Sequence, residues 1–274
     1  MSGEGEASPW YVDTFRSGYL TRYPHRTEAE ATGLVRMLGL TGQGAIDWRD
    51  QRVLDLACGA GRFVPALLDA GAAQVTGLDL SRDLLAVAGE RLASSVSAGV
   101  VELIEGDMRA VPRAAGSFDV VTSFFTSFGY FDDDAENARV FDEVARLLRP
   151  GGWFVFDFLN APVVIRDLEA RTELLLPDGR GVVVHERSFD AATGRLRKVS
   201  RWPDGSEDRE SVRAYEPEVL ELMLAGSGLR VARRFGSYEG LPFDATTSSR
   251  FLVVAQRDQG GSKIGEVNAG GATS

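Results

Sequence analysis

The feature that most constrains the fold is a series of short apolar segments, separated by helical patterns, between Val53 and Asp157. These segments have the length of strands and are rich in Val, Leu and Phe; they read RVLDLA, QVTGLDL, VVELIEG, FDVVTSFF and WFVFDFL. Strands without a polar face are typical of a parallel sheet that helices cover on both sides. The intervening helices carry end signals, such as Ser81 before one and Gly71 after another. The pattern therefore predicts a doubly wound α/β domain.

The pattern changes after Asp157, where apolar and polar residues alternate around pairs of turn-forming residues. Alternation between tight turns predicts antiparallel strands; the turn signals are Asp178-Gly179, Thr193-Gly194 and Asp204-Gly205. We therefore expect an antiparallel β insertion at residues 165–215. If the insertion follows the fifth strand, it lies over the carboxyl edge of the parallel sheet, where it acts as a lid and a substrate selector.

Residues 10–160 and 216–257, on either side of the insertion, are predicted to form one α/β core. A helix with Pro217 in its first turn and Gly226 near its end, followed by two strands, completes this core. Residues 258–274 are rich in Gly, Ser and Ala, so burial of apolar groups cannot offset the entropy of ordering them. This tail is predicted to be disordered.

Charge and rare residue types exclude several classes of function. Asp and Glu number 40 against 30 Lys and Arg, and the formal charge of −10 disfavours nucleic acid and anionic membranes as partners. One cysteine and two histidines supply neither a disulfide framework nor a structural zinc site, so no metal is expected unless carboxylates bind it. Residues 1–9 lack the order of a secretory signal and no long apolar span follows, so the expected location is the cytoplasm. A homodimer is compatible with these features, which leave the oligomeric state open.

A turn of small residues, Ala57-Cys58-Gly59-Ala60-Gly61, follows the first predicted strand. Glycine there can serve the turn's own backbone angles, or it can let the backbone approach a ligand; the turn alone favours neither reading. Asp79 ends the second predicted strand, eighteen residues after Gly61, where its carboxylate can accept hydrogen bonds from both ribose hydroxyls. A role in capping the next helix beside Ser81 is the alternative and is compatible with ribose binding.

The third predicted strand ends in EGDMR, which places Asp107 at the same edge of the sheet. Its carboxylate can accept a hydrogen bond from the exocyclic amine of an adenine, with Leu80 and Met108 on the two faces of the ring. Val64 replaces the third glycine of a G-x-G-x-x-G dinucleotide motif, and no Gly-Lys-Ser/Thr of a P-loop follows. The residues favour an adenosine cofactor other than a dinucleotide.

In this order, the turn, the two acids and the later LLRPGGWFVF resemble the class I S-adenosylmethionine-dependent methyltransferases over most of residues 15–257. The resemblance implies a Rossmann-like, seven-stranded, mostly parallel sheet and S-adenosyl-L-methionine as cofactor. It also implies that the backbone of Ala57, Gly59 and Gly61 cradles the methionine end of this cofactor. The segment SFFTSFGYF from Ser123 is similar to its counterpart in bacterial sugar N-methyltransferases and glycine-type N-methyltransferases. The Asn/Asp-Pro-Pro-Tyr/Phe signature of nucleic-acid amino-methyltransferases is missing there.

Four phenylalanines in this segment pose a choice between core packing and ligand contact. We expect two of the four to be core residues and take Phe124 as a cofactor contact, because aromatic rings attract the sulfonium cation. Tyr130 and Thr126 lie on a loop at the ligand-facing edge, where function usually resides; the other phenylalanines are Phe125, Phe128 and Phe131.

The resemblance implies that the segment before the first strand folds over the cofactor, with Tyr23 and Arg26 as candidates to reach its carboxylate. A solvated helix cap is the alternative for Arg26. A general base is optional; Tyr130 and His185 are the catalytic candidates, with nearby carboxylates beside them. On the predicted lid, charged side chains face either an acidic or polyhydroxyl substrate or plain solvent; they are Arg187, Arg197 and Arg201.

The expected function is in-line methyl transfer from S-adenosylmethionine to an amine or hydroxyl of a small molecule, in a setting such as secondary metabolism. A sulfonium is already an activated leaving group, so the chemistry needs no metal. The alternatives are a protein that binds the cofactor without methylating, a non-methylating catalyst, and a nicotinamide-dependent reductase, which Val64 disfavours. The residues do not identify the acceptor, the acceptor atom or a base.

Overall fold

The computed structural model describes residues 9–15, 28–39, 45–176, 179 and 181–259. Predictions that fall elsewhere lie outside the described residues: these are Tyr23, Arg26, the turn at Asp178 and the tail from residue 260 onward. Among the described helices, none combines the length and apolar character that crossing a bilayer requires.

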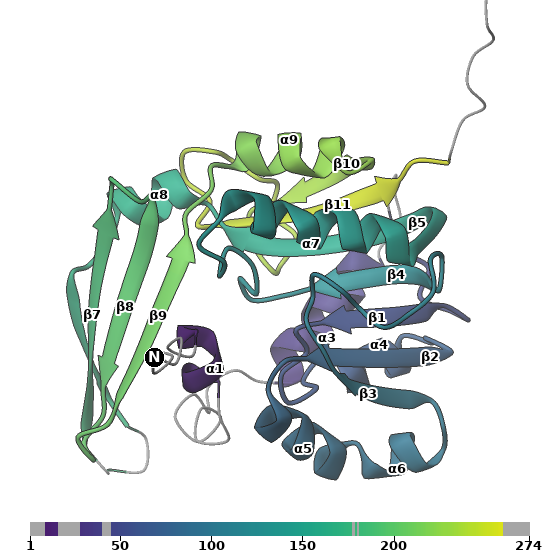
Figure 1. The fold of residues 1–274 in the computed structure, drawn as a ribbon, viewed down its shortest axis with the longest axis horizontal. Coiled ribbons are helices and arrows are strands. Elements are labelled where there is room, and N and C mark those ends of the chain that lie inside the picture. The colour runs from purple at the N-terminus through teal and green to yellow at the C-terminus, as the bar shows by residue number, and fades with distance from the viewer. Residues whose placement is uncertain (1–8, 16–27, 40–44, 177–178, 180, 260–274) are drawn as a thin grey trace, which may run out of the picture.

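A seven-stranded sheet forms the centre of the molecule, in the order β10-β11-β5-β4-β1-β2-β3 (Figure 1). Strands β1 to β5 run parallel, and β11 is antiparallel to both of its neighbours. The bounds are β1 Arg52–Leu56, β2 Gln74–Asp79, β3 Val101–Glu105, β4 Phe118–Ser123, β5 Leu148–Leu159, β10 Leu229–Phe235 and β11 Arg250–Arg257. The predicted doubly wound, mostly parallel α/β fold is confirmed.

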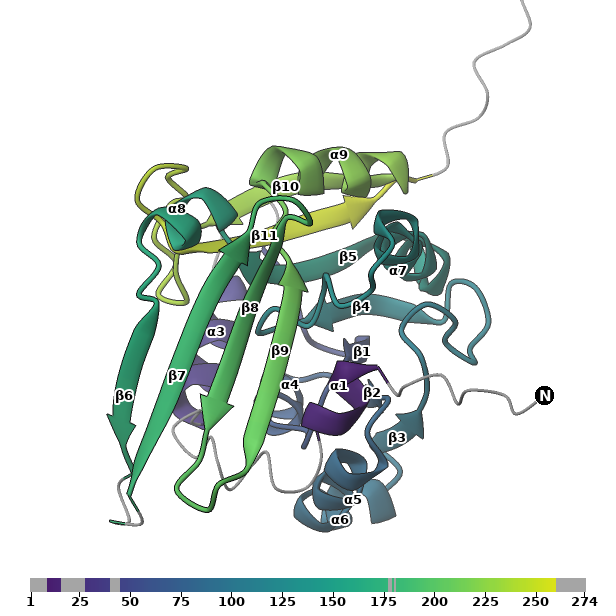
Figure 2. The same cartoon turned by 60° about the vertical axis from the view of Figure 1, so that its left-hand side comes forward.

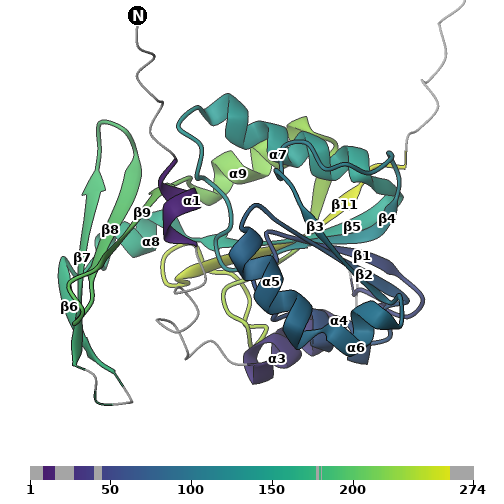
Figure 3. The same cartoon turned by 60° about the horizontal axis from the view of Figure 1, so that its bottom comes forward.

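Helices cover both faces of this sheet, as Figure 3 shows. Alternate strand residues face opposite layers, so Val53 packs with α3 and α4 whereas Leu54 packs with α7 and α9. The helices are α1 Trp10–Thr14, α3 Glu28–Leu38, α4 Val64–Asp69, α5 Arg82–Arg91, α6 Ala93–Ser97, α7 Asp134–Leu147, α8 Ala161–Arg166 and α9 Pro217–Gly226. Burial on both faces explains why the strand segments carry almost no polar alternation.

In the sequence, Pro150 and the two glycines after it predict the end of the helix that precedes them, but this helix, α7, ends earlier, at Leu147. Leu148 already pairs with Phe118 of β4, and Gly151 adopts a φ of 76° before the strand continues. Proline cannot donate the backbone hydrogen bond of a helix interior, and here it lies within an irregular start of β5. The motif LLRPGG is therefore mostly strand.

A second, antiparallel sheet with the order β6-β7-β8-β9 is inserted between α8 and α9; we call it the lid sheet. Its strands are β6 Arg171–Leu175, β7 Val182–Asp190, β8 Arg195–Arg201 and β9 Glu207–Arg213. The predicted turns at Gly194 and Gly205 join these strands, with φ angles of 63° and 81°. Figures 1 and 2 show the lid sheet standing across the edge of the main sheet, with α1 between them. Thr14 Oγ1 fastens α1 to β9 by donating to the Arg209 carbonyl at 2.7 Å.

Candidate functional site

A cavity of about 640 Å³ lies at the carboxyl ends of β1, β2, β3 and β4, and side chains of the lid sheet and α1 close it. Its size falls within the range of about 300–1,000 Å³ that is typical of small-molecule sites. In open α/β sheets this edge is where ligands bind. The arrangement brings the three predicted strand-end motifs to one space.

The turn after β1 presents backbone to this cavity. Ala57 and Gly59 line it, with left-handed φ angles of 57° and 55°. Among the described residues, a Cβ placed on Gly59 would meet only Leu84, at 3.8 Å, so none of them closes the turn on that side. Gly61 differs, because a Cβ there would lie 2.8 Å from Leu92 Cδ1. Gly61 thus allows close helix packing, and it is not among the described residues that line the cavity.

Asp79 joins the turn to the start of α5. Its Oδ2 accepts the Gly59 N–H and its Oδ1 accepts the Ser81 N–H, both at 2.8 Å. Burial raises the pKa of Asp79, while these backbone hydrogen bonds oppose the rise. The side-chain cap of α5 is Ser81, whose Oγ accepts the Leu84 N–H, so the carboxylate of Asp79 is not the helix cap. Asp79 lines the cavity and has lone pairs left for a ligand.

Asp107 lies just after β3 and is held by Arg109. The carboxylate accepts the Arg109 N–H at 2.8 Å and its Nε–H at 3.0 Å. Burial acts to raise the pKa of Asp107, but the hydrogen bonds and charge of Arg109 outweigh it and the pKa falls. Leu80 and Met108 also line the cavity, and Leu80 is 43% exposed although it is apolar. An exposed apolar side chain beside a carboxylate suits a flat ring that carries an amine.

The segment after β4 contains two neighbouring residues with strained backbones. Phe125 and Thr126 have φ angles of 61° and 62°, which are rare for an aromatic and for a β-branched residue. Both line the cavity, as does Phe124, whose ring stacks on Phe63 at 4.1 Å. Phe128 belongs wholly to the core, stacked on Phe141 at 4.5 Å. Strain of this kind persists only where surrounding contacts enforce it.

Asp157, for which no sequence motif predicted a role, supplies those contacts. This fully buried carboxylate accepts the Phe125 N–H at 2.8 Å, the Tyr238 hydroxyl at 2.7 Å and Arg250 Nε–H at 2.9 Å. Its backbone carbonyl accepts the Thr126 N–H at 3.1 Å. A signal was present, since an aspartate within an apolar strand must find partners when it is buried.

Asp55 is a second overlooked acid, on β1 beneath the turn. It is 2% exposed, lines the cavity and accepts the Thr122 hydroxyl at 3.0 Å through Oδ1. Burial raises the pKa of Asp55 to about 7, against the opposing hydrogen bond from Thr122. Within the part of the chain that the structure describes, Asp55 Oδ2 has no hydrogen-bond donor. An unsatisfied buried acceptor on a cavity wall suits a ligand that carries a donor or a positive charge.

Tyr130 lines the cavity from the loop after β4 and lies among the rings of α1 and of Phe15, the residue that follows this helix. Its ring centroid is 5.0 Å from Trp10, 6.1 Å from Tyr11 and 5.8 Å from Phe15. Phe131 follows it into the same wall, with the Arg109 guanidinium 4.0 Å from the centre of its ring. The structure thus brings the predicted aromatic loop against the N-terminal helix.

His185 occupies a different environment from Tyr130. It is buried in the lid sheet with Nδ1 2.9 Å from Ser200 Oγ on β8, and it is not among the described cavity-lining residues. The geometry therefore does not support a role for His185 as a general base. No group of three or more metal-binding side chains occurs among the described residues.

Several charged groups of the lid sheet face the cavity. Arg187 donates to Thr172 Oγ1 at 2.7 Å, and Lys198 pairs with Glu210 at 2.9 Å. Arg197 lines the cavity too and pairs with Asp190 at 2.9 Å. Arg201 is instead half exposed and pairs with Glu186, as a solvated side chain would.

Comparison with known proteins gives a consistent result. A family model described as a methyltransferase domain matches residues 53–152. A putative methyltransferase, YqeM, of Bacillus subtilis is 35% identical over 220 residues, which cover 76% of this chain and 85% of that protein. A ubiquinone biosynthesis O-methyltransferase of Thiobacillus denitrificans is 36% identical over 213 residues, covering 76% and 79%.

Solved structures share the fold at low sequence identity. The CcbJ methyltransferase from Streptomyces caelestis superposes with a TM-score of 0.74 at 22% identity, covering 89% of this chain and 98% of that one. CalS10, an amino pentose methyltransferase from Micromonospora echinaspora whose structure contains S-adenosylmethionine, gives a TM-score of 0.65 at 22% identity, covering 88% and 95%. These likenesses establish a common architecture that includes most of both chains.

Proposed function

The chain belongs to the class I S-adenosylmethionine-dependent methyltransferases, and we propose that its acceptor is a small molecule bound between the main sheet and the lid sheet. The observation that carries this proposal is one cavity, of about 640 Å³, that receives the turn after β1, Asp79, Asp107 and side chains of the lid sheet. Its volume suits a cofactor together with a compact acceptor.

The residues present fit the cofactor that the family uses. We propose that Asp79 accepts hydrogen bonds from the ribose hydroxyls and that Asp107 accepts one from the adenine amine, with Leu80 and Met108 beside the ring. Two groups would then face the methionine end: Oδ2 of Asp55, which has no donor among the described residues, and the side of Gly59 that no described residue closes. A positive charge there would satisfy the buried acceptor. Phe124 contributes an aromatic wall nearby.

When bound, the cofactor supplies a methyl group on a sulfonium, which is an activated leaving group. The task of this chain is to align the acceptor with that methyl group and to exclude water, an effect worth up to roughly 7–11 kcal/mol. Side chains of the lid sheet and the rings of α1 close the cavity from the side opposite the strand ends. This closure is what we propose keeps water from the reacting atoms.

The acceptor atom is proposed to be an amine nitrogen or a hydroxyl oxygen. An amine must arrive neutral and a hydroxyl must lose its proton, so a proton acceptor near the substrate aids either reaction. Tyr130 is the better of the two predicted candidates because it lines the cavity, unlike His185. The net charge of −10 favours small acceptors over nucleic acid.

Turnover with a methyl-labelled cofactor tests this function. The purified protein is offered amino sugars, phenols, quinols and small primary amines, with a DNA oligonucleotide as a macromolecular control. We expect transfer to at least one small acceptor, none to DNA, and loss of transfer in Asp79→Ala. Tight binding of S-adenosylhomocysteine without transfer to any small acceptor would instead favour a cofactor-binding protein that does not methylate.

A further inference from the structure

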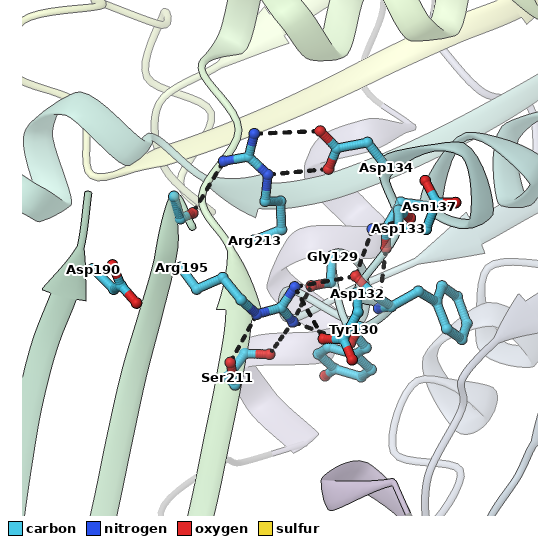
Figure 4. A network of polar contacts seen from close by, with 12 residues as sticks. Gly129, Tyr130, Asp132, Asp133, Asp134, Asn137, Asp190, Arg195, Ser211 and Arg213 are labelled. Atoms are coloured by element: carbon cyan, nitrogen blue, oxygen red, sulfur yellow. Dashed lines mark hydrogen bonds and ion pairs between the residues drawn. The ribbon is translucent and has the colours of Figure 1, made fainter. Parts of the chain in front are cut away.

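Arg195, the first residue of β8, sends its side chain out of the lid sheet to the loop that carries Tyr130 (Figure 4). The guanidinium donates to three consecutive carbonyl oxygens of that loop: Gly129 at 3.3 Å, Tyr130 at 3.1 Å and Phe131 at 3.1 Å. It also donates to Ser211 of β9, to Oγ at 2.8 Å and to the carbonyl at 2.9 Å. One cation therefore joins two strands of the lid sheet to the cavity wall.

The charge of Arg195 is balanced mainly by these carbonyl dipoles. The residue is 6% exposed, and the carboxylate that comes nearest in the described part of the chain, Asp132, lies 3.7 Å away with a fully exposed side chain. Burial lowers the pKa of Arg195, yet arginine stays protonated in proteins. A buried cation held by backbone oxygens fixes the direction of those oxygens, and hence the path of the loop.

The loop is held on its other side by α7. Asn137, which is fully buried, accepts the Phe131 N–H at 3.3 Å and donates to the Phe131 carbonyl at 2.9 Å. Arg213, at the end of β9, also contacts the loop: its N–H donates to the Gly129 carbonyl at 2.8 Å. The Arg213 guanidinium pairs with Asp134 of α7 at 3.0 Å. With its carbonyls committed to Arg195, the loop directs the side chains of Tyr130 and Phe131 into the cavity wall.

We propose that Arg195 is a positioning residue that holds Tyr130 in the acceptor chamber and ties its position to the lid sheet. The assignment of this chamber to an acceptor rests on the proposed function; the coupling of loop and lid sheet does not. Removing the guanidinium takes the hydrogen bond of Arg195 from the partly buried Tyr130 carbonyl, whereas the Gly129 and Phe131 carbonyls keep Arg213 and Asn137 as donors. A desolvated acceptor that loses its donor costs about 1–3 kcal/mol, so we expect the loop to shift at Tyr130. Lysine is a poor replacement, because a compact ammonium with three donors cannot reproduce a planar fork with five.

Fluorine NMR of protein labelled with 3-fluorotyrosine tests the coupling without cofactor or acceptor. Tyr130→Phe assigns the Tyr130 resonance, which the stacked rings of Tyr11 and Phe15 should displace strongly. In Arg195→Met we expect this resonance to move by more than its linewidth, while that of Tyr238 stays in place. Arg201→Met is the matched control, because Arg201 lies on the same strand but is half exposed and pairs with Glu186.

An unchanged Tyr130 resonance in folded Arg195→Met would overturn the proposal. If that variant does not fold, Arg195→Lys is measured instead, with the same displaced resonance expected and an unchanged one again decisive against it. With an acceptor from the turnover panel, Arg195→Met should raise KM for the acceptor by about tenfold or more and leave the affinity for S-adenosylhomocysteine within about twofold. Loss of cofactor affinity in this variant would contradict a role confined to the acceptor side.

Discussion

Asp55 lies beneath the turn after β1 in a site where burial, partly opposed by Thr122, raises its pKa to about 7. The folded protein therefore retains a proton on Asp55 between about pH 4 and pH 7, where the unfolded chain has released it. A group whose pKa is raised on folding stabilises the fold fully when the pH is below the pKa of that group in the unfolded chain. This stabilisation is lost as the pH rises through the pKa of the group in the folded protein. Ionised Asp55 destabilises the fold, because its charge is buried.

Asp55→Asn should remove this contribution to the dependence of stability on pH. We expect the free energy of unfolding of the wild type, relative to Asp55→Asn, to decrease from pH 4.5 to pH 7 and to level off near pH 8. Urea denaturation of both proteins at a series of pH values measures this difference in the free energy of unfolding. A difference that is flat or that rises over this range would show that Asp55 is not the weak acid described here.

Asp157 shows how one buried residue controls a strained segment. Asp157→Asn removes the charge that pairs with Arg250 and should lower the free energy of unfolding by about 3–5 kcal/mol. Asp167→Asn is the control, since its pair with Arg166 is well exposed and should contribute nothing measurable. Chemical denaturation of the two variants side by side measures the contrast, and equal small effects would rule out the anchoring role of Asp157.

Residue by residue, the sequence predicted the polar groups at strand ends better than those inside strands. Asp79 and Asp107 were accessible to prediction because the carboxyl ends of parallel strands meet at one edge. Asp55 and Asp157 lie within apolar strands, where periodicity reports burial but not which partner satisfies a charge. The loop carbonyls that accept hydrogen bonds from Arg195 are 64 to 66 positions away along the chain, so no local pattern could reveal them.

At the scale of elements, the contact between the lid sheet and the loop after β4 depends on one glycine. Gly129 has a φ of 80°, and a Cβ there would lie 2.9 Å from the Arg213 carbonyl oxygen. Gly205 has nearly the same φ, 81°, and a Cβ there would have no described residue within 4 Å. Substitutions at these two positions therefore distinguish the cost of a left-handed backbone from the cost of a steric clash.

Gly205→Ala should cost about 1–2 kcal/mol through the left-handed backbone alone. Gly129→Ala should cost at least about 1 kcal/mol more, because its methyl group presses on β9. Thermal and urea unfolding of both variants provide the comparison. If Gly129→Ala were no worse than Gly205→Ala, the loop and β9 could separate freely and the coupling through Arg195 would lose its basis.

Element types were predictable for the same reason that some boundaries were not. Alternation between Gly-containing turns identified β7, β8 and β9, since each hairpin is a local structure. The end of α7 was placed too late because Leu148 and Arg149 fit a helix as well as a strand, and only pairing with β4 decides between them. Tertiary pairing overrides local preference at such junctions.

At the scale of the whole molecule, two sheets enclose a site that neither forms alone. The main sheet contributes the predicted cofactor residues, whereas the lid sheet and α1 contribute the opposite wall. The division of the chain into residues 10–160 with 216–257 and an insertion at 165–215 remains a prediction, as does a homodimer. The sequence predicted that the lid sheet crosses the strand ends, but it could not predict which lid side chains reach the cavity.

A ligand that binds in this enclosed site should stabilise the whole fold. At one hundred times its dissociation constant, S-adenosylhomocysteine should add about 2.7 kcal/mol to the free energy of unfolding. For a chain of this size, that corresponds to a rise in Tm of roughly 5–10 °C. Differential scanning fluorimetry checks the shift, and no shift at such concentrations would contradict a preformed cofactor site.

Calorimetric titration with S-adenosylhomocysteine is the most direct test of the central claim, that the cofactor binds at the carboxyl ends of β1, β2 and β3. Asp79→Ala should weaken binding at least about tenfold, because a charge-assisted hydrogen bond contributes about 1.5–3 kcal/mol. Asp69→Ala, an exposed aspartate at the end of α4, is the matched control and should bind as the wild type does. Equal affinity in wild type and folded Asp79→Ala would contradict the assignment of the cofactor site.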